Sequence, residues 1–374
     1  MTVSVVRALG LVARRAAHAA DPTADPAVNP AVDPVAGAVA GPASDPSRCR
    51  ACGHTEAVLA ERGEGVVVRH GKAVAKAHAD GTDPADHRVR LAVAAHPRLT
   101  GILLPPLPPV PADTGAVRGR PVTAWPYGSP VDPADPDAAP WEQAGGLVAR
   151  LHSVPLEAIR AAVRTTGALP PMRGPAKAAR AVARLRAAGP HPAAGLVLRA
   201  WERLPAWARD EAPSPGPAAL CHGDLHLGQL VRHPAPDGPW LLIDVDDLGI
   251  GDPAWDLARP AAWYAAGLLP PEIWQRFLGA YRAARGPAVP TTAAVPTTAG
   301  LDPGPDPAVY TAAYPDPWPR LDVPARALTV QTAALAIAKS VTEDRDLDEV
   351  EHLMIDACGR IASLPPELEP PRSS

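Results

Sequence analysis

The sequence predicts an α+β chain of two lobes, a small β-rich lobe followed by a larger, mostly helical lobe. Two observations support this order. Short β-rich runs lie before residue 130, and helical spacing of apolar residues dominates from about Trp141 onwards. The 374 residues are enough for one large domain or two ordinary ones.

Two proline-rich segments have a composition that does not support a packed core. Residues 21–47 repeat Asp-Pro and Asn-Pro with few large side chains, and residues 286–319 contain AVPTTA twice in tandem. Such segments cannot bury enough surface to offset the entropy lost on ordering. We therefore expect disordered tails over residues 1–47 and 365–374, and a low-complexity insertion over residues 286–319.

The β-rich lobe is expected over residues 48–128. Residues 66–78 hold two β-rich runs around His70-Gly71, and glycine tolerates positive φ, so a tight hairpin fits. Residues 101–107 predict another strand. Residues 120–128 predict a strand that ends in a turn and joins the two lobes.

The helical lobe is expected over residues 129–364. Its first helix begins near Trp141, where Ala144, Leu147 and Leu151 share one helical face. Further helix-like segments cover residues 157–165, 175–188 and 194–209.

Composition limits the partners and the compartment. The net charge of −4 and the pI of about 6.3 do not favour nucleic acid as a partner. No apolar run approaches the roughly 20 residues of a membrane span, and arginines interrupt the apolar opening stretch, which argues against a secretory signal. We expect a cytoplasmic protein without a membrane or nucleic-acid partner, and no obligate protein partner is evident. The excess of arginine over lysine is typical of a GC-rich bacterial genome.

The four cysteines, Cys49, Cys52, Cys221 and Cys358, are too few for a disulfide framework. Cys49 and Cys52, followed by His54, hint at a metal site. A structural zinc site needs four ligands, however, usually from two such pairs. The favoured interpretation is therefore two reduced thiols at the edge of a domain.

Two stretches concentrate the candidate chemistry. In AALCHGDLHLGQLV, residues 218–231, glycines permit tight turns, so Asp224 is expected on a rigid, partly exposed loop between short strands. A carboxylate placed in this way can accept the proton of a substrate hydroxyl. Gln229 offers an amide oxygen, and the apolar strand 240–244 ends in Asp244.

A hairpin between these stretches would bring Asp224, Gln229 and Asp244 to one end of a sheet. Amide and carboxylate oxygens suit Mg²⁺, which completes its coordination with phosphate oxygens and water. Two oxygen ligands beside a separate base are what phosphoryl transfer from ATP requires.

Three motifs within residues 218–260 together resemble the aminoglycoside phosphotransferase and choline kinase-like family. HGDLHLGQ, residues 222–229, is similar to the catalytic loop of that family. IDVD, residues 243–246, is similar to its metal-binding segment, and GDPAWDLA, residues 251–258, resembles the segment that follows. The resemblance implies a two-lobed, protein-kinase-like fold.

The resemblance also implies roles for single residues. Asp224 would be the catalytic base that orients the acceptor hydroxyl, and Gln229 and Asp244 would hold Mg²⁺. Asp256 would brace the catalytic loop through backbone hydrogen bonds, and His222 would support the loop as well.

The nucleotide would bind the β-rich lobe. Lys76 matches the lysine that contacts the α- and β-phosphates, and it is one of only four lysines among 36 basic residues. AWPYG, residues 124–128, resembles the hinge that holds adenine and contains Trp125 and Tyr127.

Two departures from the family pattern concern Gln229, the expected magnesium ligand, and Lys76, the lysine expected to contact the phosphates. Gln229 stands where the family usually has asparagine, with the same amide oxygen on a longer stem. No glutamate occurs between Lys76 and Gly101 to pair with the lysine, and Asp83 and Asp86 are shorter alternatives.

The predicted function is that of an ATP- and Mg²⁺-dependent kinase acting on a hydroxyl of a sugar, aminosugar or amino alcohol. The acidic run at residues 342–353 could attract a cationic acceptor, although a charged helix face is usually only solvated. One alternative is a catalytically weak or inactive kinase-like nucleotide-binding protein. Another is a metal-dependent hydrolase that uses Asp224, Asp244 and His226, which is less favoured because such sites normally contribute more ligands.

Overall fold

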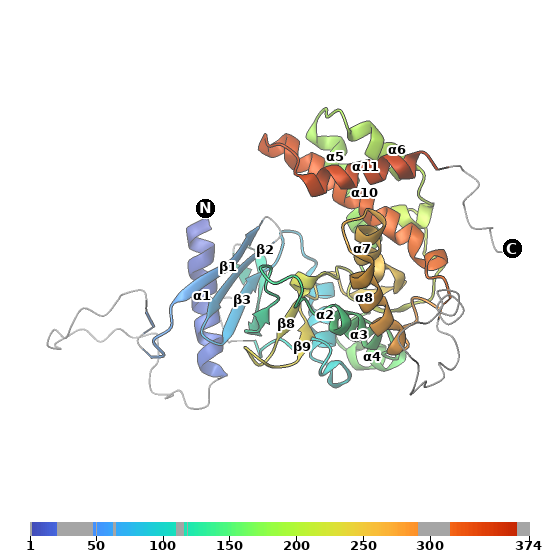
Figure 1. The fold of residues 1–374 in the computed structure, drawn as a ribbon. Coiled ribbons are helices and arrows are strands. Elements are labelled where there is room, and N and C mark those ends of the chain that lie inside the picture. Colours follow the sequence, from blue (N-terminus) through green and yellow to red (C-terminus); the bar gives the residue numbers. More distant parts are fainter. Residues whose placement is uncertain are drawn as a thin grey trace, which may run out of the picture. The chain divides into compact units, whose positions relative to one another are not determined.

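The fold is given by a computed structural model that describes residues 2–20, 48–49, 51–62, 65–109, 116–117, 119–290 and 315–364 (Figure 1). The chain divides into two units. Unit 1 comprises Met1–Pro130, Thr165–Gly167 and Val231–Ile243, and unit 2 comprises Val131–Arg164, Ala168–Leu230 and Asp244–Ser374.

Unit 1 is built on an antiparallel sheet with the strand order β1-β2-β3-β5-β4. Its strands are β1 (Glu56–Arg62), β2 (Gly65–His70), β3 (Ala73–Ala77), β4 (Ala116–Val117) and β5 (Arg120–Pro126). The hairpin predicted around His70-Gly71 is confirmed, because β2 pairs with β3 and Gly71 has a φ of 55°. Side chains alternate along both strands, so Val68 and Ala75 are buried on one face while Lys76 lies on the other.

Helix α1 (Thr2–Ala19) covers the buried face of this sheet, which corrects the expectation of a disordered tail over residues 1–47 (Figure 1). Val5, Leu9, Val12 and Ala16 recur at helical spacing and pack against the strands. The expectation extended the composition of residues 21–47 to the first twenty residues, which contain no proline. Residues 21–47 themselves lie outside the described residues.

The strand expected over residues 101–107 is wrong. Leu103 makes only an isolated parallel bridge to Leu242, at the end of β9 (Trp240–Leu242). Pro105 and Pro106 follow directly, and because proline has no N–H group the ladder cannot continue. The hairpin expected after Val231 does form: β8 (Leu230–Arg232) and β9 are neighbours in a small sheet that also contains β6 (Ser129–Pro130).

Unit 1 also contains helix α2 (Pro84–Ala94) and the short 3₁₀ helix η1 (Pro97–Leu99). Helix α2 begins directly after Asp83, whose side chain accepts hydrogen bonds from the first free amides of the helix.

Unit 2 is mostly helical. Its helices are α3 (Trp141–His152), α4 (Leu156–Val163), α5 (Gly174–Ala188), α6 (Ala194–Glu202), α7 (Ala254–Ala265), α8 (Pro271–Ala283), α10 (Trp318–Glu343) and α11 (Glu349–Ala362). Helix α10 packs against α5, α7 and α11, and α3 packs against α8. The helices expected near residues 157–165 and 175–188 are confirmed. The one expected over 194–209 ends at Glu202, because Pro205 starts the separate 3₁₀ helix η2 (Ala206–Arg209).

Most of the low-complexity insertion expected over residues 286–319, namely residues 291–314, lies outside the described residues, as does the tail at 365–374. The insertion prediction ends too late, because α10 already begins at Trp318. None of the described helices is both long enough and apolar enough to cross a bilayer.

Two adjacent glycines of α3 provide a test of how closely α3 and α8 approach. A Cβ atom on Gly145 would lie 2.3 Å from the carbonyl oxygen of Phe277 in α8, whereas one on Gly146 would meet nothing within 4 Å. We expect Gly145→Ala to lower the free energy of unfolding by about 1–3 kcal/mol because the helices must separate. Gly146→Ala should leave it unchanged or raise it by up to about 1 kcal/mol. Urea unfolding followed by circular dichroism distinguishes the two, and equal effects would contradict the close approach.

Candidate active site

The polar loop after β7 (Ala219–Cys221) is held by its backbone. Strand β7 pairs with β10 (Gly249–Gly251), and the loop begins at His222. The amides of His222 and Gly223 donate hydrogen bonds of 2.6 and 2.7 Å to the two carboxylate oxygens of Asp256, in the first turn of α7. Asp256 is 1% exposed, so the loop is anchored to the interior of unit 2 immediately before Asp224.

Behind Asp256 runs a chain of buried hydrogen bonds. His152 Nε2 lies 2.9 Å from the Asp256 carboxylate, and His152 Nδ1 lies 2.8 Å from the hydroxyl of Tyr281. That hydroxyl accepts a hydrogen bond from the amide of Ala288, so its own proton points to Nδ1. The proton of the His152 imidazole is then on Nε2, which donates a hydrogen bond to the Asp256 carboxylate.

This network keeps Asp256 ionised. Burial by itself would raise the pKa of Asp256, but the hydrogen bond from His152 and the loop amides outweigh it, and the pKa lies below its ordinary value. Helices α3, α7 and α8 are thereby joined to the loop through one carboxylate.

Gly223 is required by its backbone and by its neighbours. Its φ is 83°, and a Cβ atom at this position would lie 2.3 Å from the carbonyl oxygen of Asp247. The loop that carries Asp224 and the segment after Asp244 therefore touch at Gly223.

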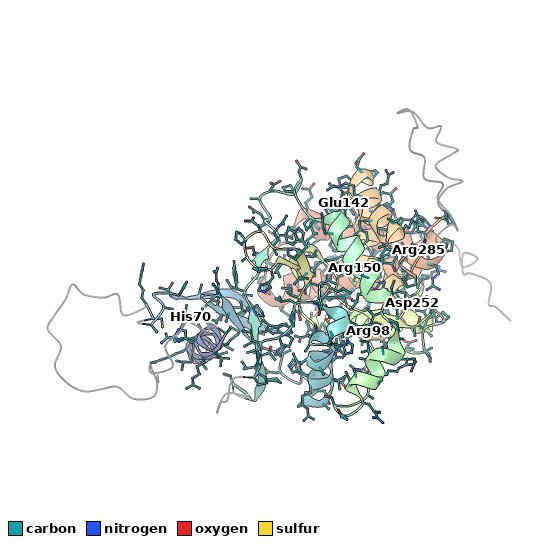
Figure 2. The ribbon with its side chains drawn as sticks, turned by 90° about the horizontal axis from the view of Figure 1, so that it is seen from below. His70, Arg98, Glu142, Arg150, Asp252 and Arg285 are labelled. Atoms are coloured by element: carbon teal, nitrogen blue, oxygen red, sulfur yellow. The ribbon has the colours of Figure 1, made fainter. Side chains whose placement is uncertain are left out.

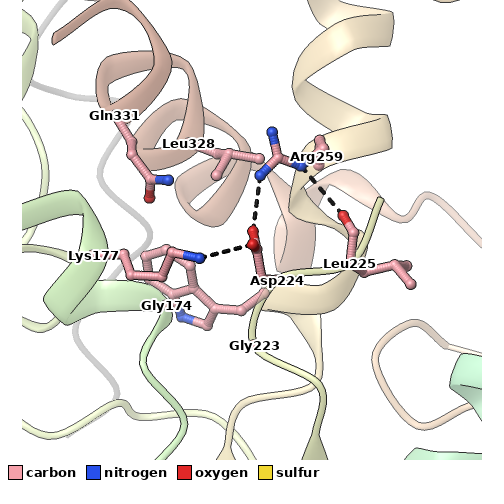
Figure 3. Close-up of a pocket in the computed structure, with 9 residues that line it drawn as sticks. Gly174, Lys177, Gly223, Asp224, Leu225, Arg259, Leu328 and Gln331 are labelled. Atoms are coloured by element: carbon pink, nitrogen blue, oxygen red, sulfur yellow. Dashed lines mark hydrogen bonds and ion pairs between the residues drawn. The ribbon is translucent and has the colours of Figure 1, made fainter. Parts of the chain in front are cut away.

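Asp224 lies between two cations (Figure 3). Its Oδ2 is 2.9 Å from Lys177 Nζ in α5, and its Oδ1 accepts a hydrogen bond of 2.9 Å from Arg259 Nη2 in α7. Lys177 also contacts Asp247 Oδ2 at 2.7 Å, and Arg259 also donates to the carbonyl oxygen of Leu225. The side chain of Asp224 is 24% exposed, so it is held in place and still accessible.

The two cations determine the protonation of Asp224. Burial alone would raise the pKa of Asp224, but Lys177 and Arg259 outweigh burial and hold the pKa well below its ordinary range. Asp224 is therefore a carboxylate at neutral pH. The carboxylate lines a small hollow between α5, α7 and α10 (Figure 3). The residues that line it are Gly174, Lys177, Gly223, Asp224, Leu225, Trp255, Arg259, Leu328 and Gln331.

His226 and Gln229 follow Asp224 in the same segment. His226 Nδ1 accepts a hydrogen bond of 3.0 Å from the amide of Gly228, and burial lowers the pKa of His226 to about 4. His226 is thus neutral at pH 7 and supports the turn. Gln229 ends the 3₁₀ helix η3 (Leu227–Gln229) and is 8% exposed.

Asp244 follows β9 in a left-handed backbone conformation. Its φ is 65°, which is unusual for a residue other than glycine, and its Oδ1 accepts a hydrogen bond of 3.3 Å from the amide of Asp246. Strained residues of this kind concentrate at functional sites. Asp224, Gln229 and Asp244 all belong to unit 2.

Lys76, by contrast, belongs to unit 1, where it lies on the sheet face opposite to α1. The two carboxylates considered as its partners have other contacts. Asp83 Oδ1 accepts hydrogen bonds from the amides of Ala85 and Asp86, and Asp86 lies 3.9 Å from Arg90.

Trp125 and Tyr127, the residues expected in the adenine hinge, also belong to unit 1. Trp125 is 8% exposed, and its Nε1 donates a hydrogen bond of 2.8 Å to Thr123 Oγ1. The guanidinium of Arg69 lies 3.4 Å above the ring of Tyr127. The amide of Tyr127 donates to the carbonyl oxygen of Lys72, so this residue is tied to the turn of the β2–β3 hairpin.

Sequence reasoning missed four residues of this site: Lys177, Arg259, His152 and Tyr281. The rarity of lysine, which singled out Lys76, applies equally to Lys177. His152 ends the helix that was predicted to begin near Trp141. No signal marks Arg259 among so many arginines.

The acidic run at residues 342–353 has a structural role. Asp348 caps helix α11 in a reciprocal arrangement with Glu351, and Arg345 forms two hydrogen bonds to Glu351, of 2.8 and 2.6 Å. These contacts account for much of the run without an acceptor.

A small antiparallel sheet unit and a helical unit with an anchored His-Gly-Asp loop define a kinase-like phosphotransferase. The sequence model of the phosphotransferase enzyme family matches residues 59–296, well over half of the chain, and the chain belongs to this family. The family resemblance is thereby confirmed. No curated protein matches the chain.

Solved structures of similar fold include kinases of several kinds. A thermostable mutant of aminoglycoside phosphotransferase APH(4)-Ia is 14% identical, with a TM-score of 0.51 over 83% of this chain and 96% of that one. Macrolide 2'-phosphotransferase MphH from Brachybacterium faecium is 20% identical (TM-score 0.44; 83% and 93%). Choline kinase LicA from Streptococcus pneumoniae is 12% identical (TM-score 0.46; 82% and 94%). At such identities the likeness concerns the fold, and the predicted α+β, kinase-like fold class is confirmed.

Proposed function

We propose that this phosphotransferase moves the γ-phosphoryl group of ATP to a hydroxyl group of a small molecule. The observation that carries the proposal is the position of Asp224. It is an accessible carboxylate on a loop anchored through Asp256, and it is ionised at neutral pH. In this position it would accept the hydrogen bond of an acceptor hydroxyl.

Because the pKa of Asp224 is low, Asp224 is a weak base, and we expect it to act mainly by orienting the acceptor hydroxyl. Phosphoryl transfer passes through a loose transition state, so catalysis depends mainly on positioning and on charge stabilisation. A weakly basic carboxylate can orient the hydroxyl oxygen and take its proton late in the reaction. Lys177 and Arg259 would restrict the side chain to the orientation that this requires.

Gln229 and Asp244 would hold a magnesium ion. An amide oxygen and a carboxylate oxygen fit this hard cation, which binds few protein ligands and keeps water and phosphate oxygens. The left-handed backbone conformation of Asp244 supports this assignment, because strained residues of this kind concentrate at functional sites. When bound, the ion would supply neutralisation of the phosphate charge.

Unit 1 would bind the nucleotide. Lys76 would contact the α- and β-phosphates from the face of the sheet opposite to α1. Trp125 and Tyr127 would form the adenine hinge. Because the indole of Trp125 is buried and bonded to Thr123, its role there would be to fix the hinge backbone.

The charges around Asp224 favour a neutral acceptor. Asp224 and Asp247 are accompanied by Lys177, Arg259 and Arg173, whose Nε lies 3.4 Å from Asp247. Of the charged side chains that line the hollow, Asp224 is a carboxylate and Lys177 and Arg259 are cations, so the hollow offers a cationic acceptor no net attraction. We therefore favour a sugar without amino groups over an aminosugar or an amino alcohol.

An acceptor panel tests this function. The full chain is incubated with ATP and Mg²⁺ together with neutral sugars, aminoglycosides or amino alcohols, and ADP formation is coupled to mass analysis of the product. We expect phosphorylation of a neutral sugar. ATP binding without turnover on any acceptor would support the inactive nucleotide-binding alternative. Metal-dependent hydrolysis that needs no nucleotide would support the hydrolase alternative.

A further inference from the structure

A second cluster of polar side chains lies in unit 1, at one end of helix α1. The ligand atoms of His18, Cys49, Cys52 and His70 all lie within 4.8 Å of one another. His18 comes from the last turn of α1, and His70 ends β2 beside that helix (Figure 2). The candidate active site uses none of the four.

The two cysteines are presented by a tight turn. The amide of Gly53 donates a hydrogen bond of 2.8 Å to the carbonyl oxygen of Cys49, and the amide of Cys49 donates one of 2.8 Å to the carbonyl oxygen of His54. Gly53 has a φ of 72°, which suits glycine. This backbone brings the sulfur atoms of Cys49 and Cys52 to one side of the turn, the arrangement that a Cys-x-x-Cys pair has in zinc sites.

Two distances between the ligand atoms are close to those of tetrahedral zinc coordination. Cys49 Sγ lies 3.7 Å from His18 Nε2, and Cys52 Sγ lies 3.2 Å from His70 Nε2. Zinc bonds of about 2.3 Å to sulfur and about 2.0–2.1 Å to nitrogen place neighbouring ligand atoms about 3.3–3.8 Å apart. Two sulfur and two imidazole donors select zinc over magnesium or calcium.

We propose that His18, Cys49, Cys52 and His70 bind a zinc ion that fastens helix α1 to the sheet of unit 1. Four protein ligands complete the coordination, which makes the site structural and not catalytic. The sequence pattern suggested two thiols at a domain edge because it showed only one cysteine pair. The missing ligands lie 31 residues before Cys49 and 18 residues after Cys52.

The metal content of the purified full chain is the first test. We expect about one zinc per chain by elemental analysis, and none after Cys52→Ser or His70→Ala. His54→Ala is the matched control, because its ring lies 6.2 Å from that of His70 but outside the four ligands. This control should retain the metal.

A second measurement needs no variant and therefore does not depend on the folding of the substituted chains. Cobalt exchanged into the wild-type chain should give thiolate-to-metal charge-transfer bands and the visible bands of a tetrahedral site. A chelator that removes the metal should lower the thermal midpoint of unfolding. A chain that takes up neither zinc nor cobalt, or that is isolated with a Cys49–Cys52 disulfide, would overturn the proposal. Zinc retained equally by Cys52→Ser and His70→Ala would do the same.

Discussion

Asp224→Asn should lower turnover by about 10²–10⁴-fold while the chain stays folded. The amide keeps the size of the side chain but can no longer take the proton of the acceptor hydroxyl. Its loss of charge also weakens the contacts with Lys177 and Arg259, which are partly exposed and so contribute little to stability. Coupled ADP release under saturating ATP and Mg²⁺ measures the effect.

Asp247→Asn is the matched control for this substitution. Asp247 contacts the same ammonium group of Lys177, at 2.7 Å, yet has no proposed contact with the acceptor. We expect a loss of less than about tenfold for this variant. Asp224→Asn activity within tenfold of the parent would exclude Asp224 as the base.

The pH profile follows from the same contacts. Because the pKa of Asp224 is held below its ordinary value of about 3.9, this group stays ionised as the pH falls from 7 to about 5. Turnover should therefore show no acid limb from Asp224 in this range.

Asp256→Ala should lower the free energy of unfolding by about 3–5 kcal/mol. The substitution removes the acceptor of the His222 and Gly223 amides and of the His152 imidazole, and it leaves two buried donors and one partly buried donor without a partner. Turnover should fall as well, because the loop that carries Asp224 is no longer anchored. Urea unfolding at pH 7 gives the first quantity.

Asp252→Ala provides the comparison within the same segment. Asp252 is nearly as buried, at 5% exposed, but its ion-pair partner Arg320 is 32% exposed and can be solvated. We expect a loss of only about 1–2 kcal/mol. Similar losses of unfolding free energy for both variants would show that the Asp256 network contributes no more to stability than the contacts of Asp252.

The stabilisation by Asp256 should also depend on pH in a defined direction. Its pKa is lower in the folded chain than in the unfolded chain, where it is about 3.9. The contribution is therefore complete above that value and is lost as the pH falls through the folded pKa.

The parts of the fold that could be predicted are those with local signals. The hairpin around Gly71 and the helix from Trp141 follow from alternation and from helical spacing within short windows. The expectations that were wrong rested on composition over residues 1–47 and on an apolar run interrupted by Pro105 and Pro106.

The site divides in a similar way. Motif residues such as Asp224 and Asp256 could be selected because their neighbours in sequence carry the pattern. Lys177 and Arg259 reach Asp224 from two different helices, and His18 and His70 reach the cysteine turn from a helix and a strand. Such partners depend on tertiary packing, which no short window of sequence contains.

The buried chain from Asp256 through His152 to Tyr281 has a consequence for substrate binding. Three helices set the position of the loop that carries Asp224, so under the proposed function an arriving acceptor could not reshape the loop without disturbing the interior. The conformational entropy of the Asp224 carboxylate is lost when the chain folds and need not be lost again each time an acceptor binds. Under the proposed function, the affinity for the acceptor would then be limited by the acceptor's own contacts and not by a rearrangement of the enzyme.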